Sequence, residues 1–312
     1  MTARRPAWRG LTIVVGALLL GGALGTTRDP EDRELTGAAR RLAPGEFVYL
    51  PDGATHYEIA GPDTGRPVLL VHGMSVPLYI WDSTVTALTG AGFRTIRLDL
   101  YGRGWSDRPD TDYDGDLTDR QLKGLLDSLG LPGPIDVIGV SYGGFVTGHF
   151  ARSYPRRVRS LTLIDPVFAS RPMPARYGLP LLGPWLWQVL EVPRMAAGQP
   201  TDFLHPEAFP EWEERYRTQQ RYEGFGRAIL RTRQQLAQTD LPALYRAVGA
   251  TGRPVLLLWG REDAVTPFEG SAVVRAAIPA AEFFPVDSAA HLPMLERSAP
   301  VHARIVDFLR AH

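Results

Sequence analysis

Short apolar runs alternate with stretches of helical pattern along most of this chain of 312 residues, and the alternation limits which folds it can adopt. The runs at 67–71, 135–138, 161–164 and 255–259 are mostly Val, Leu and Ile, which is typical of strands buried on both faces. Between them lie helical patterns such as 117–130, where four leucines share one face. We therefore predict an α/β fold, with a mostly parallel sheet and helices on both faces.

The alternation is interrupted once. Residues 167–239 show no strand pattern and contain a part rich in Pro and Trp followed by helical patterns. We predict that this stretch is a helical cap, inserted between the two parts of an α/β core at 45–166 and 240–312. Most of its Trp and Leu side chains are expected to pack the cap on the core, while a few line an apolar pocket.

The N-terminal residues 1–27 read as a targeting segment rather than as part of the fold. Arg4, Arg5 and Arg9 precede an uncharged apolar run at 11–24, and small residues follow it. We expect export with cleavage, to the periplasm or outside the cell, or retention as a membrane anchor, so membrane association through the N-terminus stays open. A polar linker is expected at 28–44.

A serine lies between a predicted strand and a predicted helix, in Gly139-Val140-Ser141-Tyr142-Gly143. Small residues two positions before and after the serine let the chain turn sharply and lift the hydroxyl clear of the sheet. This pattern predicts a nucleophile elbow at Ser141. The alternative is a serine in an ordinary Gly-rich turn, so the other residues of the site have to support the assignment.

A serine hydroxyl needs a base to remove its proton and an acid to orient that base. Among seven histidines, His291 alone lies in a loop after the last predicted strand, at 283–286, at the edge of the sheet where catalytic groups gather. For the acid we choose Asp263, which follows the run at 255–259. The order Ser141, Asp263, His291 suits this fold. Glu262 and Asp165 are the rival acids.

Two backbone N–H groups should stabilise the oxyanion that develops during attack. The residue after the nucleophile supplies one of them, so we predict the N–H of Tyr142. The second should come from the loop after the run at 67–71, where His72-Gly73-Met74 lies, and we predict the N–H of Met74.

The chain resembles the α/β-hydrolase superfamily, in the serine-nucleophile branch that carries a helical cap, similar to carboxylesterases and monoacylglycerol lipases. The resemblance rests on His72-Gly73, the elbow around Ser141, and three further motifs, which are Asp99-Leu100-Tyr101-Gly102-Arg103-Gly104-Trp105-Ser106, Gly260-Arg261-Glu262-Asp263 and Ala290-His291-Leu292-Pro293. The family often has Gly where this chain has Ala290. The resemblance implies an eight-stranded sheet and hydrolysis without a cofactor, through an acyl-enzyme.

Within this superfamily we predict a carboxylic ester hydrolase whose substrate is a small apolar ester. Haloalkane dehalogenases and epoxide hydrolases use Asp at the elbow, which Ser141 disfavours. A carbon–carbon bond hydrolase, thioesterase, amidase, haloperoxidase-like enzyme or non-catalytic ligand receptor remains an alternative.

A formal net charge of zero argues against nucleic acid as a partner. We expect no metal, because the chain has no Cys and no His pair at ligand spacing. The oligomeric state stays open.

Overall fold

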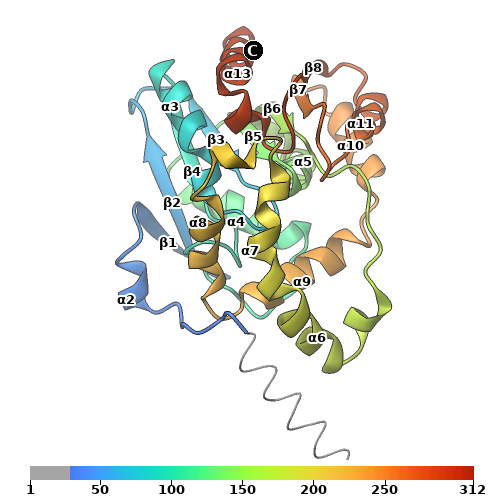
Figure 1. Ribbon diagram of the computed structural model, residues 1–312. Helices are drawn as coiled ribbons and strands as arrows, with labels where there is room; N and C mark the ends of the chain where they lie inside the picture. The colour runs from blue at the N-terminus through green and yellow to red at the C-terminus, as the bar shows by residue number, and fades with distance from the viewer. Residues whose placement is uncertain (1–28) are drawn as a thin grey trace, which may run out of the picture.

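The computed structural model describes residues 29–312, and its centre is an eight-stranded sheet (Figure 1). The sheet order is β1-β2-β4-β3-β5-β6-β7-β8. The pairs β1/β2 and β2/β4 are antiparallel and all other pairs are parallel, which confirms the predicted mostly parallel sheet. The strands are β1 (Glu46–Leu50), β2 (Gly53–Ala60), β3 (Pro67–Val71), β4 (Arg94–Leu98), β5 (Ile135–Val140), β6 (Val158–Ile164), β7 (Val255–Gly260) and β8 (Glu282–Val286).

Helices cover both faces of this sheet because its strands are apolar on both sides. In β3, Val68 and Leu70 point into one core, while Leu69 and Val71 point into the other. The first core is closed by α3 (Asp82–Gly90) and α13 (Ser298–Ala311). The second is closed by α4 (Gly115–Ser128), α5 (Tyr142–Ser153), α10 (Leu241–Ala250) and α11 (Gly270–Ala277). The prediction of 117–130 for α4 was two residues late, because Asp114 caps the helix by accepting from the Leu117 N–H.

Between β6 and α10 the structure places helices and 3-10 turns, and no strand occurs anywhere in 167–239. We propose that this insertion is the cap, and we call it the cap segment. It lies in front of the sheet in Figure 1. Its helices are α6 (Leu182–Leu190), α7 (Met195–Gly198), α8 (Trp212–Gln220) and α9 (Phe225–Leu236).

The predicted targeting segment 1–27 lies outside the described residues. Within residues 29–312, no helix has both the length and the apolar character needed to cross a membrane.

A histidine buried where α13 packs on α3 should make the protein less stable in acid. His302 is buried with its Nε2 3.1 Å from Oγ1 of Thr84, and burial lowers the pKa of His302 to about 4. An unfolded histidine has a pKa of about 6.5, so the unfolded state takes up the proton first and stability falls as the pH drops from 6.5 towards 4. We expect the free energy of unfolding to fall by about 2 kcal/mol between pH 7 and pH 5 because of this group.

Urea unfolding of the protein and of His302→Gln at both pH values measures this effect. Between pH 7 and pH 5, the free energy of unfolding should fall by about 2 kcal/mol less in the variant than in the unchanged protein. Equal pH dependence in the two proteins would show that His302 is not the group responsible.

Candidate active site

The sheet topology brings the predicted nucleophile and the predicted oxyanion loop together. The strands β3 and β5 are neighbours, and their carboxyl ends lead into Gly73 and Ser141 respectively. A ligand site is expected at such a point in an open α/β sheet. A β-carbon added to Gly73 would lie 3.3 Å from the Cβ of Ser141, so the two loops are in close contact.

The backbone at Ser141 has the strained form expected of an elbow. Its φ of 55° and ψ of −119° are rare for a residue with a side chain. Gly139 and Gly143 permit this turn, because a β-carbon on Gly139 would collide with the carbonyl of Gly143, and one on Gly143 with the carbonyl of Val71. The sequence therefore needs glycine at both positions to place Ser141 at the start of α5.

The predicted base and acid meet at the same edge of the sheet. Nδ1 of His291 lies 2.8 Å from Oδ2 of Asp263, and both side chains are almost completely buried. Asp263 also accepts hydrogen bonds from the N–H groups of Val265 and Thr266 and from the Thr266 hydroxyl. An acceptor at Nδ1 fixes the tautomer that leaves Nε2 free to take a proton.

The charges of the pair support each other against the cost of burial. Burial disfavours the charged form of both side chains, but their mutual attraction outweighs it. The pKa of Asp263 is therefore held below its usual value, and the pKa of His291 is raised above 6.5. Asp263 stays ionised while His291 is a stronger base than a free imidazole.

The two rival acids occupy other positions. Glu262 is exposed and accepts from the Ala289 N–H at 3.0 Å. Asp165 is fully buried and accepts from the Gly260 N–H at 2.8 Å. Burial and the nearby charge of Asp263 raise the pKa of Asp165 well above its usual value, which favours the uncharged form of this carboxyl.

Ser141 lies where two cavities meet. The first, which we call the histidine cavity, has a volume of about 130 Å³ and is lined by Ser141 and His291 together. The second, the arginine cavity, has a volume of about 240 Å³ and is lined by apolar side chains such as Phe168 and Leu236 and by Arg171 and Arg233. In the described residues no hydrogen bond joins Ser141 Oγ to His291. Such contacts commonly tighten only when substrate binds.

Both predicted oxyanion donors are available for a ligand. In the part of the chain that the structure describes, the N–H groups of Met74 and Tyr142 donate to no protein acceptor. Met74 lines both cavities beside Ser141, and Tyr142 opens α5, where N–H groups have no acceptor within the helix. The N-terminus of α5 adds a positive partial charge at the same place.

The sequence pattern did not reveal three residues that shape this site. Asp202, in the cap segment, accepts the His291 N–H through its backbone carbonyl at 3.1 Å and also lines the histidine cavity. Burial raises the pKa of Asp202 to about 6. Glu296 accepts from the N–H groups of Ala290 and Leu204, and so joins the histidine loop to the cap segment. These contacts depend on the tertiary fold and leave no local signal.

Arg103 is the third such residue, a buried cation that fixes the oxyanion loop. Its guanidinium donates to the carbonyls of Met74 and Tyr101 at 2.8 and 2.9 Å, and to Oγ1 of Thr232 on α9 at 2.8 Å. It also lies over the ring of Tyr142, 5.6 Å from the centroid. Among the described residues no carboxylate forms an ion pair with Arg103, so no neighbouring side chain neutralises its charge.

Arg103→Met should lower kcat by about 10²-fold with little change in KM, because it loosens the loop that carries the Met74 N–H. Steady-state kinetics measure the two constants, and circular dichroism checks that the variant is folded. Arg253→Met removes an exposed arginine from the loop before β7 and is the matched control. A folded Arg103→Met variant with wild-type kcat would show that Arg103 has no such role.

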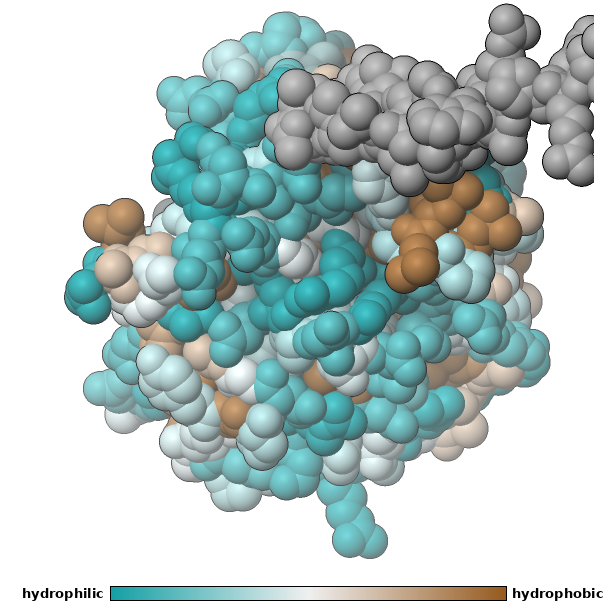
Figure 2. Space-filling model, turned by 90° about the horizontal axis from the view of Figure 1, so that it is seen from below, coloured by the Kyte–Doolittle hydropathy of each residue, from teal (hydrophilic) through white to brown (hydrophobic). Residues whose placement is uncertain are grey.

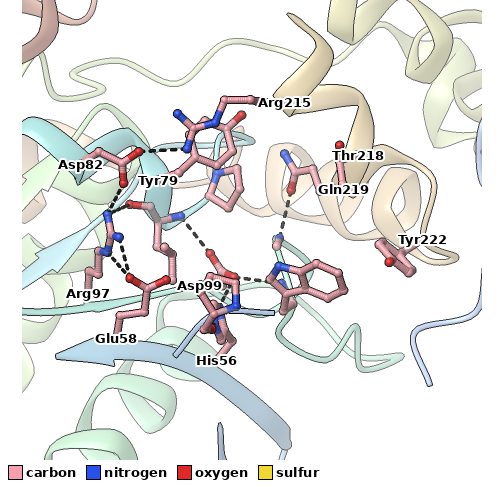
Figure 3. A pocket seen from close by; sticks show the side chains of 15 residues that line it. His56, Glu58, Tyr79, Asp82, Arg97, Asp99, Arg215, Thr218, Gln219 and Tyr222 are labelled. Carbon is pink, nitrogen blue, oxygen red and sulfur yellow. Dashed lines mark hydrogen bonds and ion pairs between the residues drawn. The ribbon is translucent and has the colours of Figure 1, made fainter. Parts of the chain in front are cut away.

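A further cavity of about 230 Å³ lies between α8 and the core, and Figure 3 shows it. None of the three predicted catalytic residues lines it, and its charges already have partners. Arg97 pairs with Glu58 and Asp82, and the His56 ring contacts Asp99 at 2.7 Å. We assign these side chains a structural role.

A model of the alpha/beta hydrolase family matches residues 68–304 of the chain. A 2-hydroxy-6-oxononadienedioate/2-hydroxy-6-oxononatrienedioate hydrolase of Cupriavidus pinatubonensis is 28% identical, over 84% of this chain and 94% of its own length. A thermophilic esterase from Thermogutta terrifontis has a similar structure, with a TM-score of 0.70 and 27% identity over 86% of this chain and 99% of that one. An enol-lactonase from Burkholderia xenovorans has the same fold, with a TM-score of 0.73 at 21% identity, over 85% of this chain and 100% of its own.

Proposed function

The chain belongs to the alpha/beta hydrolase family, and we propose that it is a serine hydrolase that cleaves carboxylic esters through an acyl-enzyme. The observation that carries the proposal is the hydrogen-bonded pair of Asp263 and His291, whose imidazole lines the same cavity as the strained Ser141. An orienting acid, a base and an accessible hydroxyl are the parts that acyl transfer requires.

In the proposed reaction, Oγ of Ser141 attacks the acyl carbon as Nε2 of His291 accepts its proton. The N–H groups of Met74 and Tyr142 donate to the oxyanion of the tetrahedral intermediate. The imidazolium, held by Asp263, then protonates the departing alcohol, and the acyl group remains on Ser141. A water molecule that gives its proton to His291 attacks this ester, and the acid leaves as Ser141 recovers its proton.

The arginine cavity supports an apolar acyl or aryl group as the part of the substrate that this site binds. Val167, Phe168, Leu236 and Val265 form much of its wall. Burial of each methylene group contributes about 0.8 kcal/mol, so a longer acyl chain should bind more tightly until the cavity is filled.

A series of para-nitrophenyl esters with acyl chains from acetate upward tests the proposal. We expect kcat/KM to rise with chain length and to reach a maximum when the cavity is full. A preference for short polar acids would overturn the apolar pocket. No hydrolysis of any ester by the folded protein would overturn the ester assignment.

A hydrolase of 2-hydroxy-6-oxo dienoic acids, acting on a carbon–carbon bond with the same triad, is the second candidate. It is favoured by the relative from Cupriavidus pinatubonensis, whose name gives such a substrate. The loop after His72-Gly73 argues against it, because that loop continues as Met74-Ser75-Val76-Pro77 and lacks the glycines usual in this class. Assay with a compound of this class, beside the nitrophenyl esters, separates the two candidates.

A further inference from the structure

Three leucines stand exposed at the outer end of the cap segment. The exposed fractions of Leu179, Leu181 and Leu182 are 47%, 90% and 48%. They lie in and just before the first turn of α6, together with the exposed Pro180 and Pro184. We call residues 179–184 the cap tip. Exposed apolar side chains grouped in this way mark an interaction surface more often than scattered ones do.

The backbone holds these leucines outward. Leu181 has φ 60° and ψ −48°, a conformation that residues with a side chain rarely adopt. The turn around it is closed by hydrogen bonds from the Leu182 N–H to the Pro180 carbonyl and from the Gly183 N–H to the Leu179 carbonyl. Gly183 packs against the Tyr177 carbonyl so closely that a β-carbon would not fit. The exposure of the cap tip is therefore built into a fixed turn.

The charge of the surrounding segment is positive. Residues 166–190 contain no Asp or Glu but include Arg171 and Arg176, both of which are exposed. Arg176 lies 3.7 Å from the carboxylate of Glu191, the next residue after this segment, whereas Arg171 has no carboxylate partner among the described residues. Trp185 and Leu186, next to the cap tip, are half-buried. Leucine, tryptophan and arginine without acidic residues make up the composition of surfaces that bind the headgroup region of anionic membranes.

The position of the cap tip agrees with such a role. The described chain begins at Asp29, whose carboxylate accepts from Nε2 of Gln188 on α6 at 2.7 Å. The sequence before Asp29 contains the apolar run 11–24 and Arg4, Arg5 and Arg9. In Figure 1, α6 forms the lower edge of the fold beside this starting point. Figure 2, seen from below, shows hydrophobic surface gathered on a face that is otherwise mostly hydrophilic.

We propose that the cap tip docks on an anionic lipid surface, with its leucines in the headgroup region and Arg171 and Arg176 near the lipid phosphates. Leu181 enters most deeply, since it has the largest exposed fraction of the three. Arg171 also lines the arginine cavity, so docking would place the mouth of this cavity close to the membrane.

The chain has no cysteine, which allows a clean test with single labels. In the full chain, Leu181→Cys carries an environment-sensitive fluorophore, and Val273→Cys on α11 is the control at another exposed apolar position. Each labelled protein is mixed with vesicles of phosphatidylcholine, with and without phosphatidylglycerol. A fluorescence label reports the position of the cap tip whether or not the N-terminal segment also binds.

We expect the label at position 181 to shift to the blue and brighten at least twofold with anionic vesicles, and to be quenched by spin-labelled lipid. The label at position 273 should stay unchanged. In the Leu181→Cys background, Arg171→Gln with Arg176→Gln should reduce the dependence on phosphatidylglycerol several-fold.

Three results would overturn the proposal. The label at position 181 could remain in water while the protein is bound to vesicles, or the protein could fail to bind vesicles at all. Alternatively, a blue shift that appears without lipid and grows with protein concentration would assign the cap tip to contact between two copies of the chain. None of these results depends on ester hydrolysis, so the proposed function is tested separately.

Discussion

Ser141→Ala should abolish ester hydrolysis, with kcat reduced by about five orders of magnitude. The substitution removes the only atom that can form the acyl-enzyme, while the Asp263–His291 pair and the oxyanion donors remain in place. The remaining rate should be close to that of a site which binds the ester and stabilises its oxyanion without a nucleophile. KM should change little, because Ser141 contributes little to binding in the ground state.

The assay compares the initial rates of para-nitrophenyl butyrate hydrolysis by the protein and by Ser141→Ala. Ser128→Ala, at an exposed position on α4, controls for the loss of a serine in general and should keep the full rate. Activity of Ser141→Ala within tenfold of the unchanged protein would mean that another group attacks the substrate.

Asp263→Asn should have the next largest effect, a loss of about 10⁴ in kcat. An amide at this position can donate a hydrogen bond to Nδ1 of His291, which stabilises the tautomer that carries its proton on Nε2. That tautomer cannot accept the proton of Ser141. The imidazolium formed during attack also loses the negative charge that stabilises it.

The same substitution should move the pH dependence of the remaining activity. His291 acts as a base only when neutral, so the activity of the unchanged protein should fall as the pH drops through a pKa that Asp263 raises above 6.5. Without this carboxylate, burial is the largest remaining influence and lowers the pKa of His291, against a smaller opposite effect of Asp202. The acid limb of kcat/KM should therefore lie at lower pH in Asp263→Asn.

Asp165→Asn is the matched control for this prediction. Burial and Asp263 raise the pKa of Asp165 and so favour its uncharged form, and an amide of the same shape can still accept from the Gly260 N–H. Its substitution should cost far less than 10⁴ in kcat. An equal loss in the two variants, measured from pH 5 to pH 9, would transfer the role of the acid to Asp165.

The sequence predicted the sheet and the arrangement of its loops because both depend on local patterns. Apolar runs such as 67–71 and 135–138 are typical of strands covered on both faces, and β3 and β5 lie at these positions. The pattern Gly139-x-Ser141-x-Gly143 predicts the elbow because its two glycines are required by contacts within the turn itself. The start of α4 was harder to place, since Asp114 caps the helix earlier than the apolar pattern begins.

Other features of the site could not be found in this way because they arise from contacts between distant segments. Arg103 reaches Met74 and Thr232, which are 29 and 129 positions away. Glu296 joins the loop of His291 to the cap segment, and its residue type is common on any exposed helix. The exposure of Leu181 depends on an unusual backbone conformation that its neighbours in the sequence do not predict.

The most direct test of the nucleophile is to react the folded protein with a fluorophosphonate and to determine the modified residue by peptide mass spectrometry. Attack by an activated serine places one phosphonyl group on Ser141, and we expect this single adduct, formed stoichiometrically and absent in Ser141→Ala. A folded protein that takes up no label, or that is labelled at another residue while Ser141 stays unmodified, would contradict it.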